Sequence, residues 1–185
     1  SKQDKALDDL ASLLKLEDVS TIELVDNSHT QGQLATSAVV VFKQGKAFKQ
    51  DYRIYHLHNN ADDVRNMEEV IYRRYLRMLK EERPFPSVLL VDGGFLQIQG
   101  TLRSLELLDV EIPVFGLVKD ERHQTSALMD RNGDRIELKD SIETFYLLTR
   151  MQDEVHRFVL SQHQKRRSKA QTYSVLDDIE GVGPK

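Results

Sequence analysis

Thr21–His29 reads T-I-E-L-V-D-N-S-H, and Val88–Gly94 reads V-L-L-V-D-G-G. Each stretch is a short apolar run of β-prone residues that leads into an aspartate, Asp26 or Asp92. A carboxylate at the end of a buried strand is costly to desolvate unless a cation pairs with it. One such aspartate alone is better explained as a turn residue, but the same layout occurs twice. We therefore expect neighbouring strands with both carboxylates at one carboxyl edge of a sheet.

Two carboxylates held side by side repel each other, and a divalent cation between them removes that repulsion. Hard oxygen ligands favour Mg²⁺ or Mn²⁺ as this cation. His156, in M-Q-D-E-V-H-R-F, could complete the ligand set, although a histidine on the polar stripe of a helix is more often a surface residue. Asp63 is a further candidate, although a role in helix capping explains it equally well. His29 could touch substrate or simply end a turn.

Composition places the chain among ordinary soluble domains. Its 185 residues suffice for one sizeable core, with 39% hydrophobic and 30% charged residues. No apolar run approaches the ~18 residues of a membrane span, so we expect no membrane partner. The first residues lack the apolar block of a signal peptide, and the absence of cysteine fits a reducing cytoplasm.

Charge is unevenly distributed along the chain. The total is −4, which argues against a generic nucleic-acid binder, but the segment from His156 reads H-R-F-V-L-S-Q-H-Q-K-R-R-S-K and contains no acid. This run is either a basic face for DNA or a solvated helix end, where cations are also favoured. The DNA-binding candidates are Arg157, Lys165, Arg166 and Arg167, followed by Lys119 and His29.

The order of predicted elements indicates an α/β domain with a mixed sheet. A three-strand meander with a Gln44-Gly45 turn comes first, and a strand, helix, strand unit later implies a parallel pair. The long helix between them has Asn60 as its candidate N-cap. Asn132-Gly133 predicts a hairpin over Ala127–Leu138, and Asp140 with Glu143 predicts the start of a final helix. We expect helices over Ala6–Leu14, Asn59–Glu82 and Leu96–Leu108, strands over Thr21–Asn27, Ser37–Lys43, Lys46–Leu57, Ser87–Asp92 and Pro113–Val118, and a charged loop over Lys119–Thr125.

Several motifs together resemble the C-terminal endonuclease domain of the UvrC family. They are L-V-D-N-S-H-T-Q-G, D-G-G with Gln97 nearby, G-L-V-K-D, and D-E-V-H-R-F followed by H-Q-K-R-R. The resemblance runs from about Thr21 to the end of the chain. It implies an RNase H-like fold, in which an antiparallel three-strand meander and parallel strands form a mixed sheet flanked by helices. It also implies the endonuclease domain over 21–170 and a linker with the truncated start of a helix-hairpin-helix module over 171–185. Residues 1–20, which precede the resemblance, are interpreted from their short amphipathic helix as a helical remnant or linker.

Members of the UvrC family are the incision subunits of bacterial nucleotide excision repair. This repair takes place in the cytoplasm and belongs to the SOS response to DNA damage. The resemblance implies a metal-dependent cut of the damaged strand on the five-prime side of a lesion. Damaged double-stranded DNA and a UvrB-like damage-recognition subunit are the implied partners, and Mg²⁺ or Mn²⁺ the implied cofactor. The family's catalytic Asp, Asp and His match Asp26, Asp92 and His156, which we interpret as metal ligands, and a further functional acid matches Asp63.

The hypothesis for the chemistry is two-metal hydrolysis of a phosphodiester, with Asp26 bridging ions about 3.5–4 Å apart. Two departures from the family pattern are visible: V-D-N-S-H replaces the commoner D-I-S-H, and Leu96 replaces the glycine of D-G-G-x-G-Q. The second bears on how closely DNA can approach the helix start. The alternatives are a catalytically silent binding module of the same fold and a phosphotransferase of the related sugar-kinase fold. The phosphotransferase alternative requires phosphate-binding glycine loops, and the residues after the first strand do not form one.

Overall fold

The computed structural model describes residues 1–28, 35–58 and 62–177, without the side chains of residues 163 and 166–177. In this part of the chain, eight strands form one mixed sheet in the order β3-β2-β1-β5-β6-β7-β8, with β4 paired to β2. No helix within the described residues is long and apolar enough to cross a membrane. The helices are α1 (Lys2–Leu14), α2 (Asp63–Lys80), α3 (Phe95–Leu107) and α4 (Ile142–Asp177). The strands are β1 (Thr21–Ser28), β2 (Thr36–Lys43), β3 (Lys46–Ala47), β4 (Arg53–His56), β5 (Val88–Asp92), β6 (Val114–Lys119), β7 (Thr125–Met129) and β8 (Arg135–Glu137).

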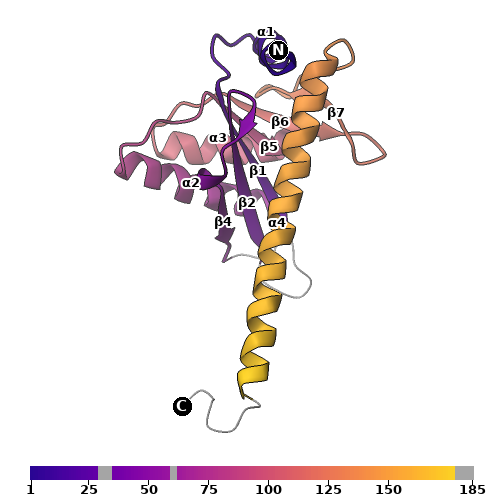
Figure 1. Ribbon diagram of the computed structural model, residues 1–185. Helices are drawn as coiled ribbons and strands as arrows, with labels where there is room; N and C mark the ends of the chain where they lie inside the picture. The colour runs from indigo at the N-terminus through magenta and orange to yellow at the C-terminus, as the bar shows by residue number, and fades with distance from the viewer. Residues whose placement is uncertain (29–34, 59–61, 178–185) are drawn as a thin grey trace.

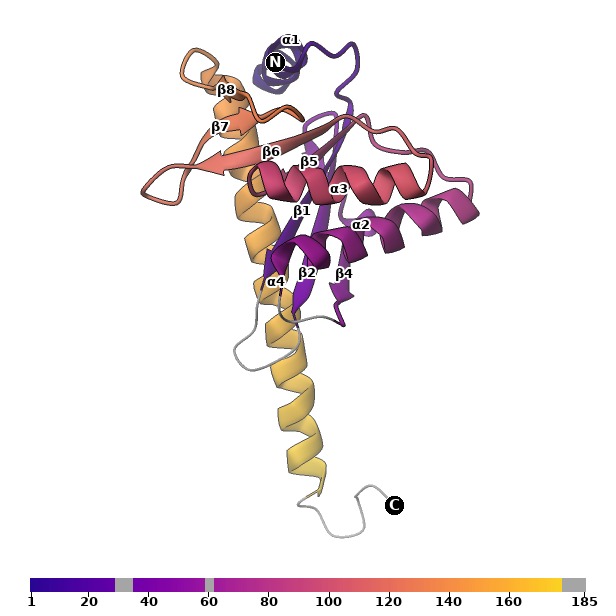
Figure 2. The ribbon, with the colours of Figure 1, turned by 180° about the vertical axis from the view of Figure 1, so that it is seen from behind.

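Helices cover both faces of the sheet. Figure 1 shows α4 crossing in front of the central strands, with α1 beside its first turns. Figure 2, from behind, shows α2 and α3 lying across the opposite face. Because both faces are covered, the central strands read as continuous apolar runs, as is typical of parallel strands in α/β proteins.

Side-chain alternation along the central strands divides the core into two layers. Leu24 of β1 and Leu90 of β5 pack with the residues of α1 and α4. Val25 and Leu89, their sequence neighbours, pack with the residues of α2 and α3. All four side chains are fully buried, and burying each contributes roughly 1.5–3 kcal/mol. This alternation determines that Asp26, two residues after Leu24, faces α4.

The predicted connectivity is present at the centre of the sheet. β1 pairs antiparallel with β2, and β1 and β5 are parallel, with Val25 opposite Val91. β5 and β6 are also parallel and are joined through α3. The predicted hairpin around Asn132-Gly133 is the β7–β8 pair, in which Leu128 lies opposite Ile136.

The predicted single strand over Lys46–Leu57 is wrong. β3 and β4 are separate short strands, with a 3₁₀ turn at Lys49–Asp51 between them. The turn redirects the chain so that Tyr52 can pack on α4. Its ring lies 5.1 Å from the ring of Phe158, and its hydroxyl donates to Glu154 over 3.1 Å. A continuous strand would lack the turn that places Tyr52 there.

Helix boundaries also differ from the predictions. α1 begins at Lys2, before the predicted Ala6, because Ser1 and Asp4 form a capping box. α2 begins at Asp63 with Asp62 as its N-cap, whereas Asn60 lies outside the described residues. α4 begins at Ile142, directly after Ser141, so Asp140 is not its cap. It continues to Asp177, which makes residues 171–177 of the predicted linker helical.

A buried ion pair, which the sequence analysis did not predict, joins β1 to α2. Arg74 Nε lies 2.6 Å from Glu23 Oε1, and both side chains are under 5% exposed. The hydroxyl of Tyr75 donates to the same oxygen over 2.7 Å. Glu23 lies three residues before Asp26 and faces the other side of the sheet, so this pair anchors the strand that carries Asp26 to α2.

Candidate metal centre

Asp26 lies inside β1 rather than at its end. The strand continues to Ser28, with Asp26 opposite Ala38 of β2. Its carboxylate is nearly buried, with 12% of the side chain exposed. The expectation that Asp26 stands at the strand end is therefore corrected, because hydrogen bonding to β2 carries the strand to Ser28, one residue beyond the predicted end at Asn27. The predicted neighbour relation with β5 is unaffected.

Asp92 is the last residue of β5 and lies beside Asp26 across the parallel pair. Val25 is in register with Val91, so the next residue on each strand is an aspartate. The Asp92 side chain is 8% exposed. Gly116 of β6 is needed for the turn that follows, because a Cβ there would lie 2.4 Å from the carbonyl oxygen of Gly93. That close approach holds the turn after Asp92 against the next strand.

His156 reaches the two aspartates from α4. Its Nε2 atom lies 3.4 Å from Asp26 Oδ2, and about half of the side chain is exposed. One ligand atom from each of Asp26, Asp92 and His156 lies within 4.8 Å of the other two, which makes this group a candidate metal site among the described residues. The structure thus brings together three residues that are 66 and 64 positions apart in the chain.

The electrostatics of the group are those of two carboxylates sharing one site. Burial, and then the charge of Asp26, raise the pKa of Asp92, while an ion pair with Lys119 opposes that rise. The hydrogen bond to Asp26 raises the pKa of His156. The Lys119 ammonium therefore supplies positive charge beside the carboxylates that a bound divalent cation could supply instead.

Among the described residues, Lys119 makes the shortest ion pair found with the two carboxylates. It ends β6, and its Nζ atom lies 2.8 Å from Asp92 Oδ2. Lys119 is predicted from the sequence only as a contact for DNA, and its ion pair with Asp92 was not predicted. The alternation of Phe115, Leu117 and Lys119 along one strand was the available signal, because the first two face the α4 side of the sheet.

Asp63 is not a member of the three-residue group in the described structure. It opens α2, and its backbone carbonyl accepts a hydrogen bond from Asn27 Nδ2 over 3.2 Å. Asn27 follows Asp26 directly, so the start of α2 is tied to the strand beside the site. His29 lies outside the described residues.

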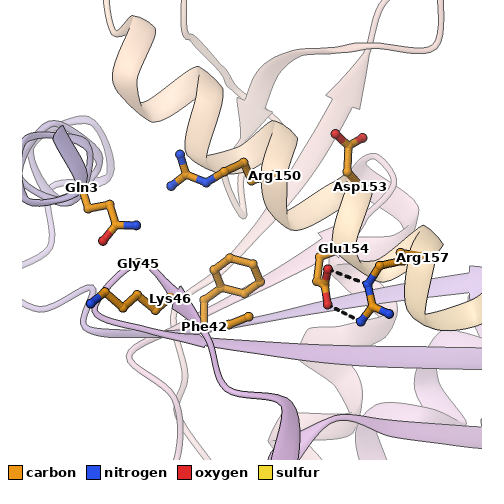
Figure 3. A pocket seen from close by; sticks show the side chains of 9 residues that line it. Gln3, Phe42, Gly45, Lys46, Arg150, Asp153, Glu154 and Arg157 are labelled. Carbon is orange, nitrogen blue, oxygen red and sulfur yellow. Dashed lines mark hydrogen bonds and ion pairs between the residues drawn. The ribbon is translucent and has the colours of Figure 1, made fainter.

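The predicted basic residues do not form one described cluster. Arg157 makes two hydrogen bonds of 2.9 and 2.6 Å with Glu154 on its own helix. Figure 3 shows this pair at a pocket that Arg150 and Lys46 also line. Lys165 is exposed further along α4, and the side chains of Arg166 and Arg167 lie outside the description.

Comparison with known families gives a match over most of the chain. A family model described as the UvrC RNase H endonuclease domain matches residues 11–160. The UvrABC system protein C of Ligilactobacillus salivarius is 45% identical over 183 residues, which are 97% of this chain and 31% of that protein. The same-named protein of Latilactobacillus sakei is 44% identical over 97% of this chain and 32% of its own length. The chain thus spans about a third of these curated relatives.

Solved structures with a related arrangement are more distant. Endonuclease V of Ciona intestinalis, in complex with inosine-containing DNA, is 18% identical with a TM-score of 0.42, over 61% of this chain and 55% of that chain. RuvC of T. thermophilus, in complex with a Holliday junction, is 15% identical with a TM-score of 0.33, over 52% and 64% of the two chains.

Proposed function

The chain belongs to the UvrC RNase H endonuclease domain family, as its motifs indicated, and we propose that it hydrolyses a phosphodiester bond of DNA in a divalent-metal-dependent reaction. The observation that carries this proposal is the group formed by Asp26, Asp92 and His156, whose ligand atoms lie within 4.8 Å of one another. The group lies at the carboxyl edge of the sheet, which is a usual position for ligand sites in α/β proteins.

The donor set suits a hard divalent cation. The two carboxylates are ligands that suit Mg²⁺ or Mn²⁺, and their neighbouring negative charges favour occupation of the site by such a cation. When bound, such an ion supplies Lewis-acid stabilisation of the charge on a phosphodiester. Asp26 and Asp92 would hold the ion through their oxygens. His156 would complete the ligand set in its neutral form. Metal binding would therefore work against the hydrogen bond to Asp26, which raises the pKa of His156 and favours its protonated form.

Residues around the group would bind and orient the DNA. Lys165, Arg166 and Arg167, on the extension of α4, would contact phosphates without reading sequence. Arg157 would join them only by exchanging Glu154 for a phosphate, since both of its hydrogen bonds now go to that carboxylate. Asp63 would support the site from the start of α2, outside the ligand set. His29 is proposed as a further DNA contact.

The finer assignments follow from family membership. We propose that the cut falls on the damaged strand, on the five-prime side of a lesion, during nucleotide excision repair. Damaged double-stranded DNA would be the substrate, and a UvrB-like damage-recognition subunit would be the partner, in the bacterial cytoplasm. Within the chain, residues 21–170 would form the endonuclease domain, and residues 171–185 would contain a linker and the start of a helix-hairpin-helix module.

A nicking assay tests the proposal. The 185-residue chain is incubated with supercoiled plasmid carrying ultraviolet damage, with Mn²⁺, Mg²⁺ or a chelator. We expect nicking that requires the divalent cation and that Asp26→Ala abolishes, while Glu81→Ala, on the far end of α2, nicks at the wild-type rate. DNA binding without any cation-dependent nicking, including in the presence of the damage-recognition subunit, would instead identify a catalytically silent binding module.

A further inference from the structure

Lys119 pairs with a carboxylate that the proposed metal site requires. Its Nζ atom lies 2.8 Å from Asp92 Oδ2, and the Asp92 side chain is 8% exposed. A nearly buried carboxylate has few alternative partners, and a lysine ammonium is a compact charge on a flexible stem. In the described structure, Asp92 is the only ion-pair partner found for Lys119. The ammonium therefore stands close to the position in which a divalent cation would be coordinated.

The strand order makes this position part of the fold rather than a chance surface contact. β5 lies between β1 and β6 in the sheet. Asp92 therefore has the strand of Asp26 on one side and the strand of Lys119 on the other. Asp92 is in register with Leu117, two residues before Lys119, and the pairing of β6 with β7 shifts register between Val118 and Lys119. Asp26, Asp92 and Lys119 thus come from three adjacent strands at one edge.

Exposure differs between the two partners. About a third of the Lys119 side chain is exposed, against 8% for Asp92. The carboxylate is fixed at the strand end, while the ammonium can swing toward solvent without moving the backbone. A cation bound by Asp92 would repel the ammonium, and the nearest anion that a nuclease brings to this edge is a DNA phosphate.

We propose that Lys119 is a positioning residue that exchanges partners. It holds Asp92 in the metal-free protein, yields Asp92 Oδ2 to a divalent cation, and then pairs with a phosphate of the bound strand. The inference rests on the proposed function, because it requires both a metal at Asp92 and DNA at the same edge. It predicts that Lys119 opposes metal binding in the free protein and strengthens DNA binding once the metal is present.

Metal titration of the 185-residue chain tests the first half. Mn²⁺ affinity is measured by calorimetry without DNA for wild type, Lys119→Met, Lys119→Arg and, as a matched control at the opposite end of the sheet, Lys43→Met. Removing a partly exposed competitor should tighten Mn²⁺ binding about three- to tenfold in Lys119→Met. Lys119→Arg, which keeps the charge, and Lys43→Met should stay within about twofold of wild type. Unchanged or weaker binding in Lys119→Met would overturn the inference.

DNA binding tests the second half. Anisotropy with a labelled duplex is followed over a range of salt concentrations, with Ca²⁺ or with a chelator. One phosphate contact contributes about 0.9 to the slope of log K against log salt, so Lys119→Met should lose about that much with Ca²⁺ and nothing in chelator. Equal slopes with Ca²⁺ would overturn the phosphate contact.

An Asp26→Ala arm separates this inference from the proposed function. If Asp26→Ala abolishes Mn²⁺ binding while Lys119→Met leaves it unchanged, the inference fails and the proposed metal site stands. If Asp26→Ala binds Mn²⁺ as wild type does, the proposed metal site itself is wrong.

Discussion

Removing one carboxylate from the candidate site should stabilise the metal-free protein. In Asp26→Asn, the repulsion between Asp26 and Asp92 disappears. Their ligand oxygens lie within 4.8 Å of each other, so two unit charges repel by at least about 3.5 kcal/mol at an effective dielectric constant of about 20. The variant also weakens the contact with His156, which is half exposed and contributes about 0.5–1 kcal/mol. After partial screening by solvent, we expect a net gain of about 1–2 kcal/mol in the free energy of unfolding.

Urea denaturation with and without Mn²⁺ measures this effect. In chelator, Asp26→Asn should unfold at higher urea than wild type, whereas Asp8→Asn, on the exposed surface of α1, should not change the midpoint. In Mn²⁺, wild type should gain stability by mass action, about 2.7 kcal/mol at a cation concentration of 100 times Kd. The variant should gain little, so the stability order reverses. A variant that is less stable in chelator, or that gains as much from Mn²⁺ as wild type, would refute the reasoning.

Two further predictions concern the buried ion pair and His156. Glu23→Ala leaves the Arg74 charge buried and unpaired, so the free energy of unfolding, measured by calorimetry or urea, should fall by about 3–5 kcal/mol. The control Glu81→Ala should change it little, and a loss in Glu23→Ala as small as that of the control would contradict the account. The raised pKa of His156 contributes stability that is fully present below its unfolded pKa and is lost as pH rises through its folded pKa. In chelator, wild type should therefore lose stability as pH rises above the ordinary histidine pKa of about 6.5, and His156→Gln should lose less. Parallel pH profiles would disprove this.

The central sheet was largely predictable from sequence. The apolar runs before Asp26 and Asp92 predicted two neighbouring strands, and parallel pairing of β1 with β5 places both residues at one edge. The mixed RNase H-like class and the resemblance to the UvrC family are confirmed. These features follow from local patterns, since burial on both faces gives a strand an unbroken apolar sequence.

Other features depended on contacts between distant segments. Tyr52 interrupts the expected third strand because it packs on Phe158, more than a hundred residues later. The buried ion pair of Glu23 with Arg74 likewise joins a strand to α2, 51 positions later in the chain. The ion pair between Lys119 and Asp92 depends in the same way on the order of β5 and β6. Single-sequence periodicity carries no information on such pairings.

Diffraction from crystals soaked in Mn²⁺, recorded at a wavelength where manganese scatters anomalously, tests the central claim most directly. The account predicts an anomalous peak within coordination distance of carboxylate oxygens of both Asp26 and Asp92 and of a ring nitrogen of His156, with Lys119 Nζ moved away from Asp92. A well-ordered site without such a peak, with the Lys119–Asp92 pair intact at saturating Mn²⁺, would contradict it.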